Sequence, residues 1–192
     1  QTTFDYLQGR EYAPDATQWA DAVRFWQSLR SDPDARFDKE VVLAASEIAP
    51  SVTWGTSPEH VLPVDAHVPS PAQAASEEQR ADYEAALDYM GLQAGMPLES
   101  IRIDQVFIGS CTNGRLEDLR SAAQVARLGK ARVPAWVVPG SQSVKRAAEA
   151  EGLDRIFMAA GFEWRSPGCS LCTAINGDEL ATGVRCASTS NR

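Results

Sequence analysis

The sequence predicts an α/β fold in which a mostly parallel sheet is covered by helices on both faces. From residue 100 onward, short apolar runs alternate with amphipathic segments, which is the pattern of strands joined by helices. Glycine, proline and serine stand between these segments and mark their ends. A hydrophobic content of 44% in 192 residues is enough for a packed core.

The first half of the chain predicts fewer regular elements. A helix is expected over 17–30, where Trp19, Ala22, Val23, Trp26 and Leu29 fall on one stripe. A short apolar run within 38–50 suits a strand. Prolines and a lack of periodicity mark 51–76 as a loop or linker containing a domain boundary. Ser76 is a suitable cap for a helix over 76–92, which has acidic residues in its first turn.

The second half predicts four strands and the helices between them. The strands are expected at 101–109, 131–140, 162–165 and 183–190, and the helices at 115–128 and 141–161. Ser141 is expected to cap the second helical segment. In such sheets ligands bind beyond the carboxyl ends of the strands. The segments that follow the first, third and fourth strands should therefore meet at one edge.

Charge and hydropathy exclude several classes of partner. With 26 acidic and 18 basic residues the net charge is −8, so nucleic acid and anionic membrane are not expected partners. No apolar run reaches about 18 residues and the start has no signal-peptide pattern, so we expect a cytoplasmic protein. The chain starts without Met and stops in "CASTSNR", as expected of a piece of a larger protein.

Cys111 lies between a strand and a helix, in "GSCTNGRLEDL". The N–H groups and dipole at a helix start favour thiolate, which is the form that binds metal. A small buried apolar residue is an equally good interpretation of Cys111 alone. Asn113 is expected either to cap the helix or to contact a ligand.

Cys169 and Cys172 form a C-x-x-C in "SPGCSLC", a spacing that lets two sulfurs reach one metal centre. A zinc ribbon would need a second close pair, and a thioredoxin-type pair would normally open a helix early in its domain, so both alternatives stay open but poorly supported. Together with Cys111, three thiolates suit an iron–sulfur cluster with one open iron, a Lewis acid for adding or removing water. Cys186 lies in an apolar strand pattern and is expected to be buried.

Arginines and serines near the strand ends are the remaining candidates. Arg192 follows Asn191 past the last strand, and a guanidinium can grip a carboxylate with two hydrogen bonds. The other arginines of interest are expected to be solvated on one helix: Arg115, Arg120 and Arg127. The Gly-Lys-Ser/Thr step of a P-loop is absent, so nucleotide phosphate binding has no support.

Four long stretches resemble the aconitase superfamily, in particular its isopropylmalate dehydratase (isomerase) branch. They are "VFIGSCTNGRLEDLRSAA", "VVPGSQSVKRAAEAEGL", "AGFEWRSPGCSLC" and "RCASTSNR", and the likeness continues upstream over nearly the whole chain. The resemblance implies an aconitase-like three-layer α/β/α fold. It also implies residues 1–65 as the end of a preceding domain, 66–96 as linker and helix, and 97–192 as a domain with cluster-binding loops, cut at its C-terminus.

The resemblance also implies a cofactor and a reaction. Cys111, Cys169 and Cys172 would ligate one 4Fe-4S cluster, with Ser110 hydrogen-bonded to it. Asn191 would lie near the cluster, and Arg192 would contact the carboxylate of a small dicarboxylate substrate. The implied enzyme is a heterodimeric hydro-lyase of leucine biosynthesis that interconverts 2-isopropylmalate and 3-isopropylmalate.

The resemblance has gaps that bear on activity. The family's N-terminal acids and histidine, its second arginine, and the base serine of the small subunit are not in this sequence, so the chain is not expected to catalyse alone. Alternatives kept open are another hydro-lyase of the family, of the homoaconitase or citraconate/methylmalate type, a cytosolic C-x-x-C thiol or metal-binding module, and an RNA-binding module.

Overall fold

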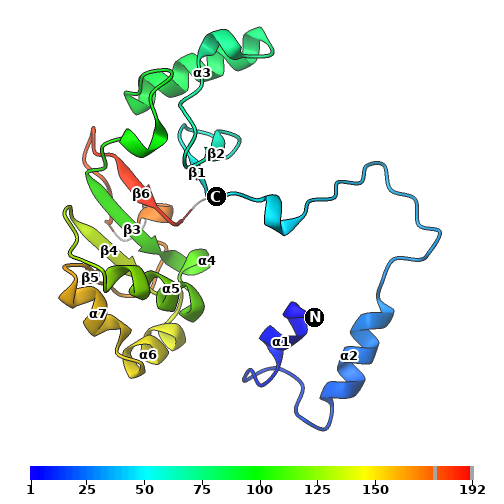
Figure 1. The fold of residues 1–192 in the computed structure, drawn as a ribbon. Helices are drawn as coiled ribbons and strands as arrows, with labels where there is room; N and C mark the ends of the chain where they lie inside the picture. Colours follow the sequence, from blue (N-terminus) through cyan, green and yellow to red (C-terminus); the bar gives the residue numbers. More distant parts are fainter. Residues whose placement is uncertain (175–176, 191–192) are drawn as a thin grey trace. The chain divides into compact units, whose positions relative to one another are not determined.

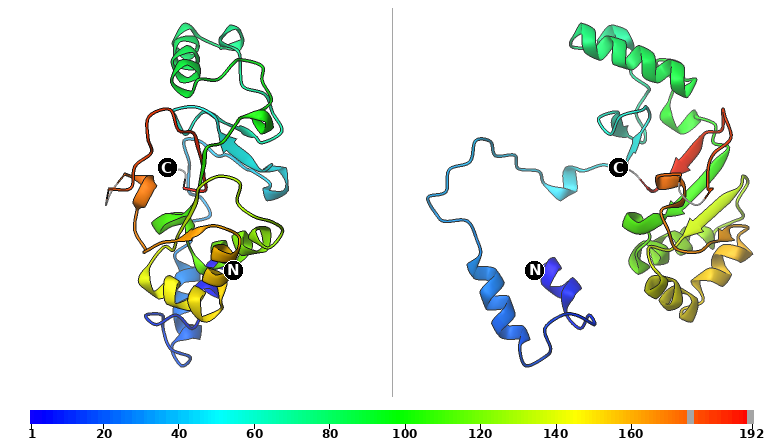
Figure 2. Two further views of the ribbon diagram at one scale, coloured as in Figure 1. Left: turned by 90° about the vertical axis from the view of Figure 1, so that its left-hand side faces the viewer. Right: turned by 180° about the vertical axis from the view of Figure 1, so that it is seen from behind.

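The computed structural model describes residues 1–174 and 177–190, and the chain divides into two compact units, Gln1–Ile48 and Ala49–Arg192. Figures 1 and 2 show the ribbon. The helices are α1 Thr2–Leu7, α2 Trp19–Ser28, α3 Glu77–Met90, α4 Ser110–Asn113, α5 Leu116–Ala126, α6 Gln142–Ala150 and α7 Leu153–Ala159. The strands are β1 Ser51–Thr53, β2 Val61–Pro63, β3 Gln105–Gly109, β4 Ala135–Val138, β5 Glu163–Trp164 and β6 Cys186–Ser188. Single 3-10 turns are η1 Ala45–Glu47, η2 Pro71–Gln73, η3 Leu98–Ser100 and η4 Ser170–Cys172.

The first unit is held together by aromatic contacts. The predicted helix is present as α2, and its Trp26 ring stacks on Phe4 of α1 and meets Trp19 edge-on, each at 5.7 Å between centroids. The strand predicted within 38–50 is wrong. Val41, Val42 and Leu43 are exposed there and no strand forms, because the described part of this unit offers no second strand to pair with them.

The second unit contains a small core around the antiparallel pair β1 and β2. Trp54, Val68, Ala86, Leu92 and Leu98 are buried together between this pair, α3 and η3. Ser76 caps α3 as predicted, since its hydroxyl accepts from the N–H of Gln79 at 3.1 Å. Gly91 ends the helix in a left-handed conformation, which is a common helix end.

The larger core belongs to a four-stranded sheet with strand order β5-β4-β3-β6, in which every pairing is parallel. The sequence prediction of an α/β fold with a parallel sheet is confirmed. Ile108, Val137 and Trp164 are register neighbours across three strands, and they pack against α5, α6 and α7. In Figure 1 these three helices lie together beside the sheet. Ser141 caps α6 through the N–H of Val144, as predicted.

Because side chains alternate along a strand, Phe107 and Trp136 point to the opposite face from Ile108 and Val137. On that face, the guanidinium carbon of Arg165 lies 4.0 Å from the centre of the Trp136 ring. The segment after β5 is thereby held against the sheet. This segment carries the C-x-x-C pair.

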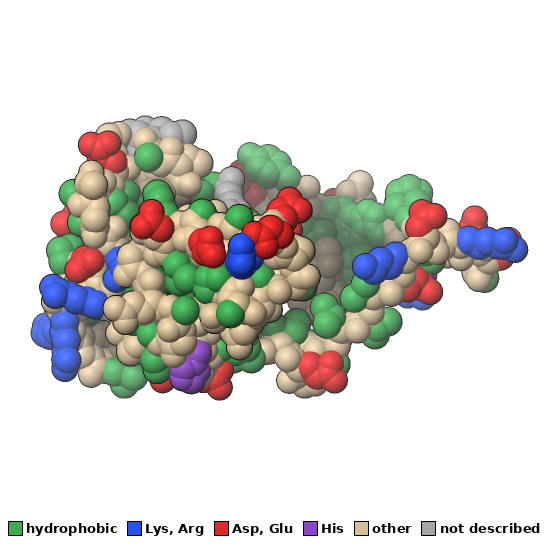
Figure 3. All heavy atoms as spheres, turned by 90° about the horizontal axis from the view of Figure 1, so that it is seen from above, with side chains coloured by type: hydrophobic (Ala, Val, Ile, Leu, Met, Phe, Trp, Pro, Cys, Tyr) green, Lys and Arg blue, Asp and Glu red, His purple; other side chains and the backbone are tan. Residues whose placement is uncertain are grey.

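Surface properties agree with the acidic composition. Figure 3 shows acidic side chains spread over the face it draws, with apolar and basic ones between them. Among the described residues, no helix is long and apolar enough to cross a membrane. The domain boundaries expected near residues 65 and 97 stay predictions.

Candidate functional site

The carboxyl ends of the four parallel strands place the candidate residues at one edge of the sheet. Cys111 is the second residue after β3, and Cys169 and Cys172 lie on the loop that follows β5. Ser190 follows β6 by two residues. Two further candidates lie outside the described residues: Asn191, expected near the cluster, and Arg192, expected to contact the substrate.

The loop after β3 is built on glycine. Gly109 has φ +107°, and a Cβ there would lie 2.1 Å from the carbonyl oxygen of Val138. A Cβ on Gly114 would lie 2.7 Å from the same oxygen, and Gly140 donates its N–H to the carbonyl of Gly114 at 2.8 Å. The loops after β3 and β4 therefore approach each other through bare backbone, which only glycine allows.

Ser110, next to Cys111, is fully buried and adopts a left-handed φ of +78°. A residue other than glycine in this region carries backbone strain, which tends to persist at functional sites. The Ser110 hydroxyl lies 2.9 Å from that of Ser190, a hydrogen bond in which either can donate. Ser110 thus joins the cysteine loop to the end of β6.

Two more hydrogen bonds fasten the same two loops. The N–H of Gly109 donates to the hydroxyl of Thr189 at 2.9 Å, and the side-chain amide of Asn113 donates to the Thr189 carbonyl. Arg115, not Asn113, is the residue that precedes α5 as its cap. The predicted cap role of Asn113 is therefore wrong; its side chain fixes the strand end that leads to Asn191.

The C-x-x-C pair lies around η4, and both thiols are half-buried. The N–H of Cys172 donates to the carbonyl of Cys169 at 3.0 Å, so the two cysteines close one tight turn. Cys111, in contrast, is exposed on the short helix α4. All four cysteines are thiols in this structure.

Cys186 is half-buried, where full burial was expected. Loss of solvent raises the pKa of its thiol, which makes the thiolate less available than in an ordinary cysteine. Cys186 lines an apolar cavity of about 220 Å³ together with Trp54, Leu98 and Ser190. The arginines predicted to be solvated, Arg115, Arg120 and Arg127, are exposed.

Within the described residues, no three His, Cys, Asp or Glu side chains are close enough together to hold a metal ion. The donor set nevertheless suits an iron–sulfur cluster in chemical kind, because all three candidates are thiols on loops at one sheet edge. Metal binding commonly completes the folding of its own ligand loops. Cluster binding would thus require the Cys111 loop and the C-x-x-C loop to move closer to each other.

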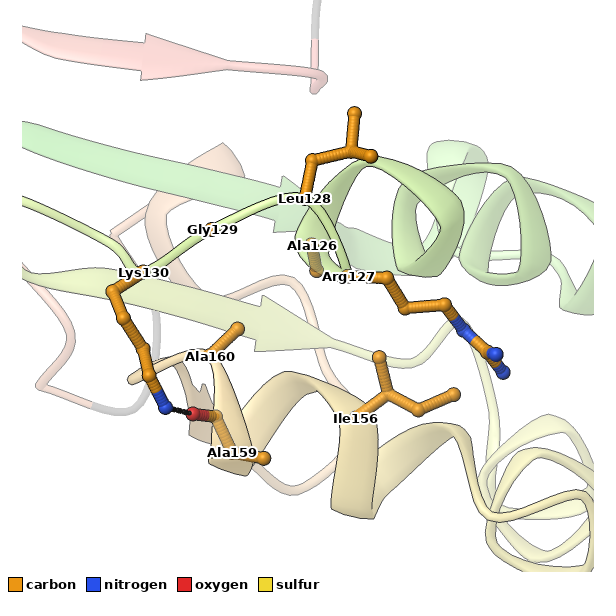
Figure 4. A pocket seen from close by; sticks show the side chains of 8 residues that line it. All are labelled: Ala126, Arg127, Leu128, Gly129, Lys130, Ile156, Ala159 and Ala160. Carbon is orange, nitrogen blue, oxygen red and sulfur yellow. Dashed lines mark hydrogen bonds between the residues drawn. The ribbon is translucent and has the colours of Figure 1, made fainter.

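Another hollow, of about 420 Å³, lies at the opposite edge of the sheet (Figure 4). It is formed where α5 and α7 end, and the Lys130 ammonium donates there to the carbonyl of Ala159. Its lining includes no carboxylate, thiol or histidine. Because ligands of parallel sheets bind at the carboxyl edge, the cysteine edge is the better candidate.

Comparison with known proteins shows the family of this chain. The model of the aconitase family (aconitate hydratase) matches residues 1–192. The chain belongs to the aconitase family. It is also 59% identical, over 194 aligned positions, to "3-isopropylmalate dehydratase large subunit 1" of Bradyrhizobium diazoefficiens. That alignment covers 100% of this chain and 41% of the relative, so the chain spans less than half the length of that aconitase-family protein.

The structure of this aconitase-family chain adds residues that sequence reasoning missed. Asp178 accepts hydrogen bonds from Arg165 and Ser170, and Thr189 accepts from the Cys111 loop. No motif or spacing singles out Asp178, since a lone acid in a loop is usually solvated. Only the fold shows that it contacts the C-x-x-C turn.

Proposed function

We propose that the chain is the cluster-binding part of the large subunit of an isopropylmalate isomerase. This hydro-lyase interconverts 2-isopropylmalate and 3-isopropylmalate by dehydration and rehydration, and we assign it to leucine biosynthesis in the cytoplasm. Family membership and the 59% identity to a dehydratase large subunit support the assignment. The observation that carries it is the position of Cys111, Cys169 and Cys172 after two parallel strands of one sheet.

In this proposal, Cys111, Cys169 and Cys172 hold one 4Fe-4S cluster as three thiolate ligands. When bound, the cluster supplies a Lewis acid, because its one iron without a cysteine can polarise a substrate hydroxyl and carboxylate. The hydrogen bonds of Ser110 and Asn113 keep the Cys111 loop next to the end of β6. The proposed reaction needs the cluster at the Cys111 loop and the residues that follow β6 to lie close together.

The end of β6 leads directly to the substrate-binding candidates. Asn191 and Arg192 follow Ser190, whose hydroxyl bonds to Ser110 beside Cys111. We expect Arg192 to bind a substrate carboxylate with two parallel hydrogen bonds and Asn191 to lie near the cluster. Thr189 and Ser190 would then set the distance between the arginine and the cysteine loop.

In this proposal, the group that removes the substrate proton is not part of this chain. We expect the small subunit to supply the serine that removes the substrate proton, so this chain alone would bind the cluster without turning over. The substrate is a small dicarboxylate, and no nucleic acid or membrane takes part. Because the chain has a net charge of −8, it does not attract such an anion as a whole. The substrate would instead be attracted locally, by Arg192 and the cluster iron.

The test uses the complete large subunit with its small subunit. Cys111→Ser is expected to abolish conversion of 2-isopropylmalate, and Cys186→Ser, at the amino end of β6 and outside the proposed ligand set, is expected to leave it unchanged. Homocitrate and citramalate serve as competing substrates. Faster conversion of either would reassign the chain to another hydro-lyase of the family, and full activity of Cys111→Ser would refute the ligand assignment.

A further inference from the structure

The carboxylate of Asp178 is shared between two groups of the C-x-x-C loop. One oxygen accepts from the Arg165 guanidinium, just before the loop, and the other accepts from the Ser170 hydroxyl at 2.7 Å. Ser170 lies between the two cysteines in the sequence. Asp178 therefore connects the start of the loop with the turn that carries both thiols.

Ser170 is the strained residue of this turn. Its φ is +49°, which is in the left-handed region, and only 3% of the residue is exposed. A buried hydroxyl without a partner is costly, so the hydrogen bond to Asp178 favours this conformation over a relaxed one. The turn geometry in which Cys172 donates to Cys169 depends on that conformation.

Arg165 links the loop to the sheet. Its backbone N–H donates to the Val137 carbonyl at 3.0 Å, and its guanidinium lies over the Trp136 ring of β4. The arginine side chain is 29% exposed and that of Asp178 is 15% exposed. A charge pair this sheltered from water is screened less than a surface pair, so it can hold geometry.

Glu163 also binds Arg165, but in a different setting. Its carboxylate accepts from the same guanidinium at 2.9 Å, while its own side chain is 63% exposed. It makes no hydrogen bond to Ser170 among those found in the described residues. Exposed pairs of this kind contribute little, so Glu163 is a matched control for Asp178.

We infer that Asp178 is a positioning residue for the C-x-x-C loop. It holds Ser170 in its left-handed conformation and ties it through Arg165 to β4, so that the Cys169 and Cys172 thiols are presented together to one soft acceptor. That the acceptor is a 4Fe-4S cluster rests on the proposed function. The positioning itself concerns only the two thiols and can be measured without iron.

The experiment measures the binding affinity of phenylarsine oxide, a probe that binds two neighbouring thiols at once. The protein used is the 192-residue chain carrying Cys111→Ser and Cys186→Ser. Loss of an outer residue that orients ligands typically costs about 10- to 100-fold in affinity. Asp178→Asn and Ser170→Ala are expected to weaken arsenical binding by that factor. Glu163→Gln is expected to leave the affinity unchanged.

Ser170→Ala removes the hydrogen bond and keeps the cost of a positive φ, which only glycine avoids. Circular dichroism of each variant reports folding, and Ser170→Ala decides the question if Asp178→Asn does not fold. Equal arsenical affinity in Ser170→Ala, Glu163→Gln and the parent chain would overturn the inference. If the chain with all four cysteines takes up no iron and sulfide, while the chain carrying Cys111→Ser and Cys186→Ser binds the arsenical tightly, the proposed cluster would be refuted and the positioning role would stay intact.

Discussion

Gly109 and Val138 approach so closely that a Cβ on Gly109 would lie 2.1 Å from the Val138 carbonyl oxygen. Gly109 also has φ +107°, a conformation that side chains rarely adopt. Gly109→Ala is therefore expected to lower the free energy of unfolding by about 3 kcal/mol, from backbone strain and the clash with β4. Urea denaturation followed by circular dichroism measures the change.

Gly129→Ala is the matched control, because a Cβ at Gly129 meets no atom within 4 Å. It is expected to change stability by less than about 0.5 kcal/mol. Similar losses in both variants would show that the close approach of the loops after β3 and β4 does not govern stability.

His60 is buried against the Trp54 ring and lies 2.6 Å from Asp82 through Nε2. The N–H groups of Thr56 and Ser57 both donate to Nδ1, so Nε2 carries the proton and donates to the carboxylate. His60→Ala removes a stacked ring and leaves these backbone donors without a partner. Thermal denaturation should show a loss of about 3 kcal/mol.

The other histidine, His67, is exposed, and His67→Ala is expected to change stability by less than about 0.5 kcal/mol. If both substitutions had the same small effect, the His60 contacts with Trp54 and Asp82 would contribute nothing to the core.

Cys186 gives a pH-dependent prediction. Burial raises the pKa of its thiol above the ordinary 9.0, so the folded chain keeps this proton at pH values where the unfolded chain loses it. The stabilising contribution is complete below pH 9.0 and decreases as the pH rises toward the folded value. Iodoacetamide alkylation of a chain with Cys186 as its sole cysteine should reach half its maximal rate above pH 9.0.

The same alkylation in denaturant is the control, with a midpoint near 9.0 expected. A midpoint in the folded chain at or below that of the denatured chain would show that the Cys186 thiol is not shielded from solvent.

Much of the sheet could be predicted from the sequence, because most of its strands lie in short, largely apolar runs with glycine, proline or serine near their ends. Ser76 and Ser141 were identifiable as caps since the physics of capping is local. The strand expected near Val42 does not form, and the reason is not local. An apolar run becomes a strand only where another strand pairs with it, and the described part of the first unit has none.

Part of the candidate site could likewise be predicted from the sequence, and part of it could not. The cysteines stand out by residue type and spacing, and the order of parallel strands predicts that their loops share an edge. The bond between Ser110 and Ser190 joins residues 80 positions apart, and the contacts of Asp178 depend on how one loop folds back. Such contacts come from tertiary packing and have no periodicity or spacing to reveal them.

The central claim is that Cys111, Cys169 and Cys172 hold one cluster, and anaerobic reconstitution tests it most directly. The chain is incubated with iron and sulfide, and its visible absorption and iron content are compared with those of Cys111→Ser and Cys186→Ser. A broad charge-transfer band with about four irons per chain is predicted for the parent and for Cys186→Ser, and its loss for Cys111→Ser. Equal iron and absorption in Cys111→Ser and the parent, or no cluster in either, would contradict the account.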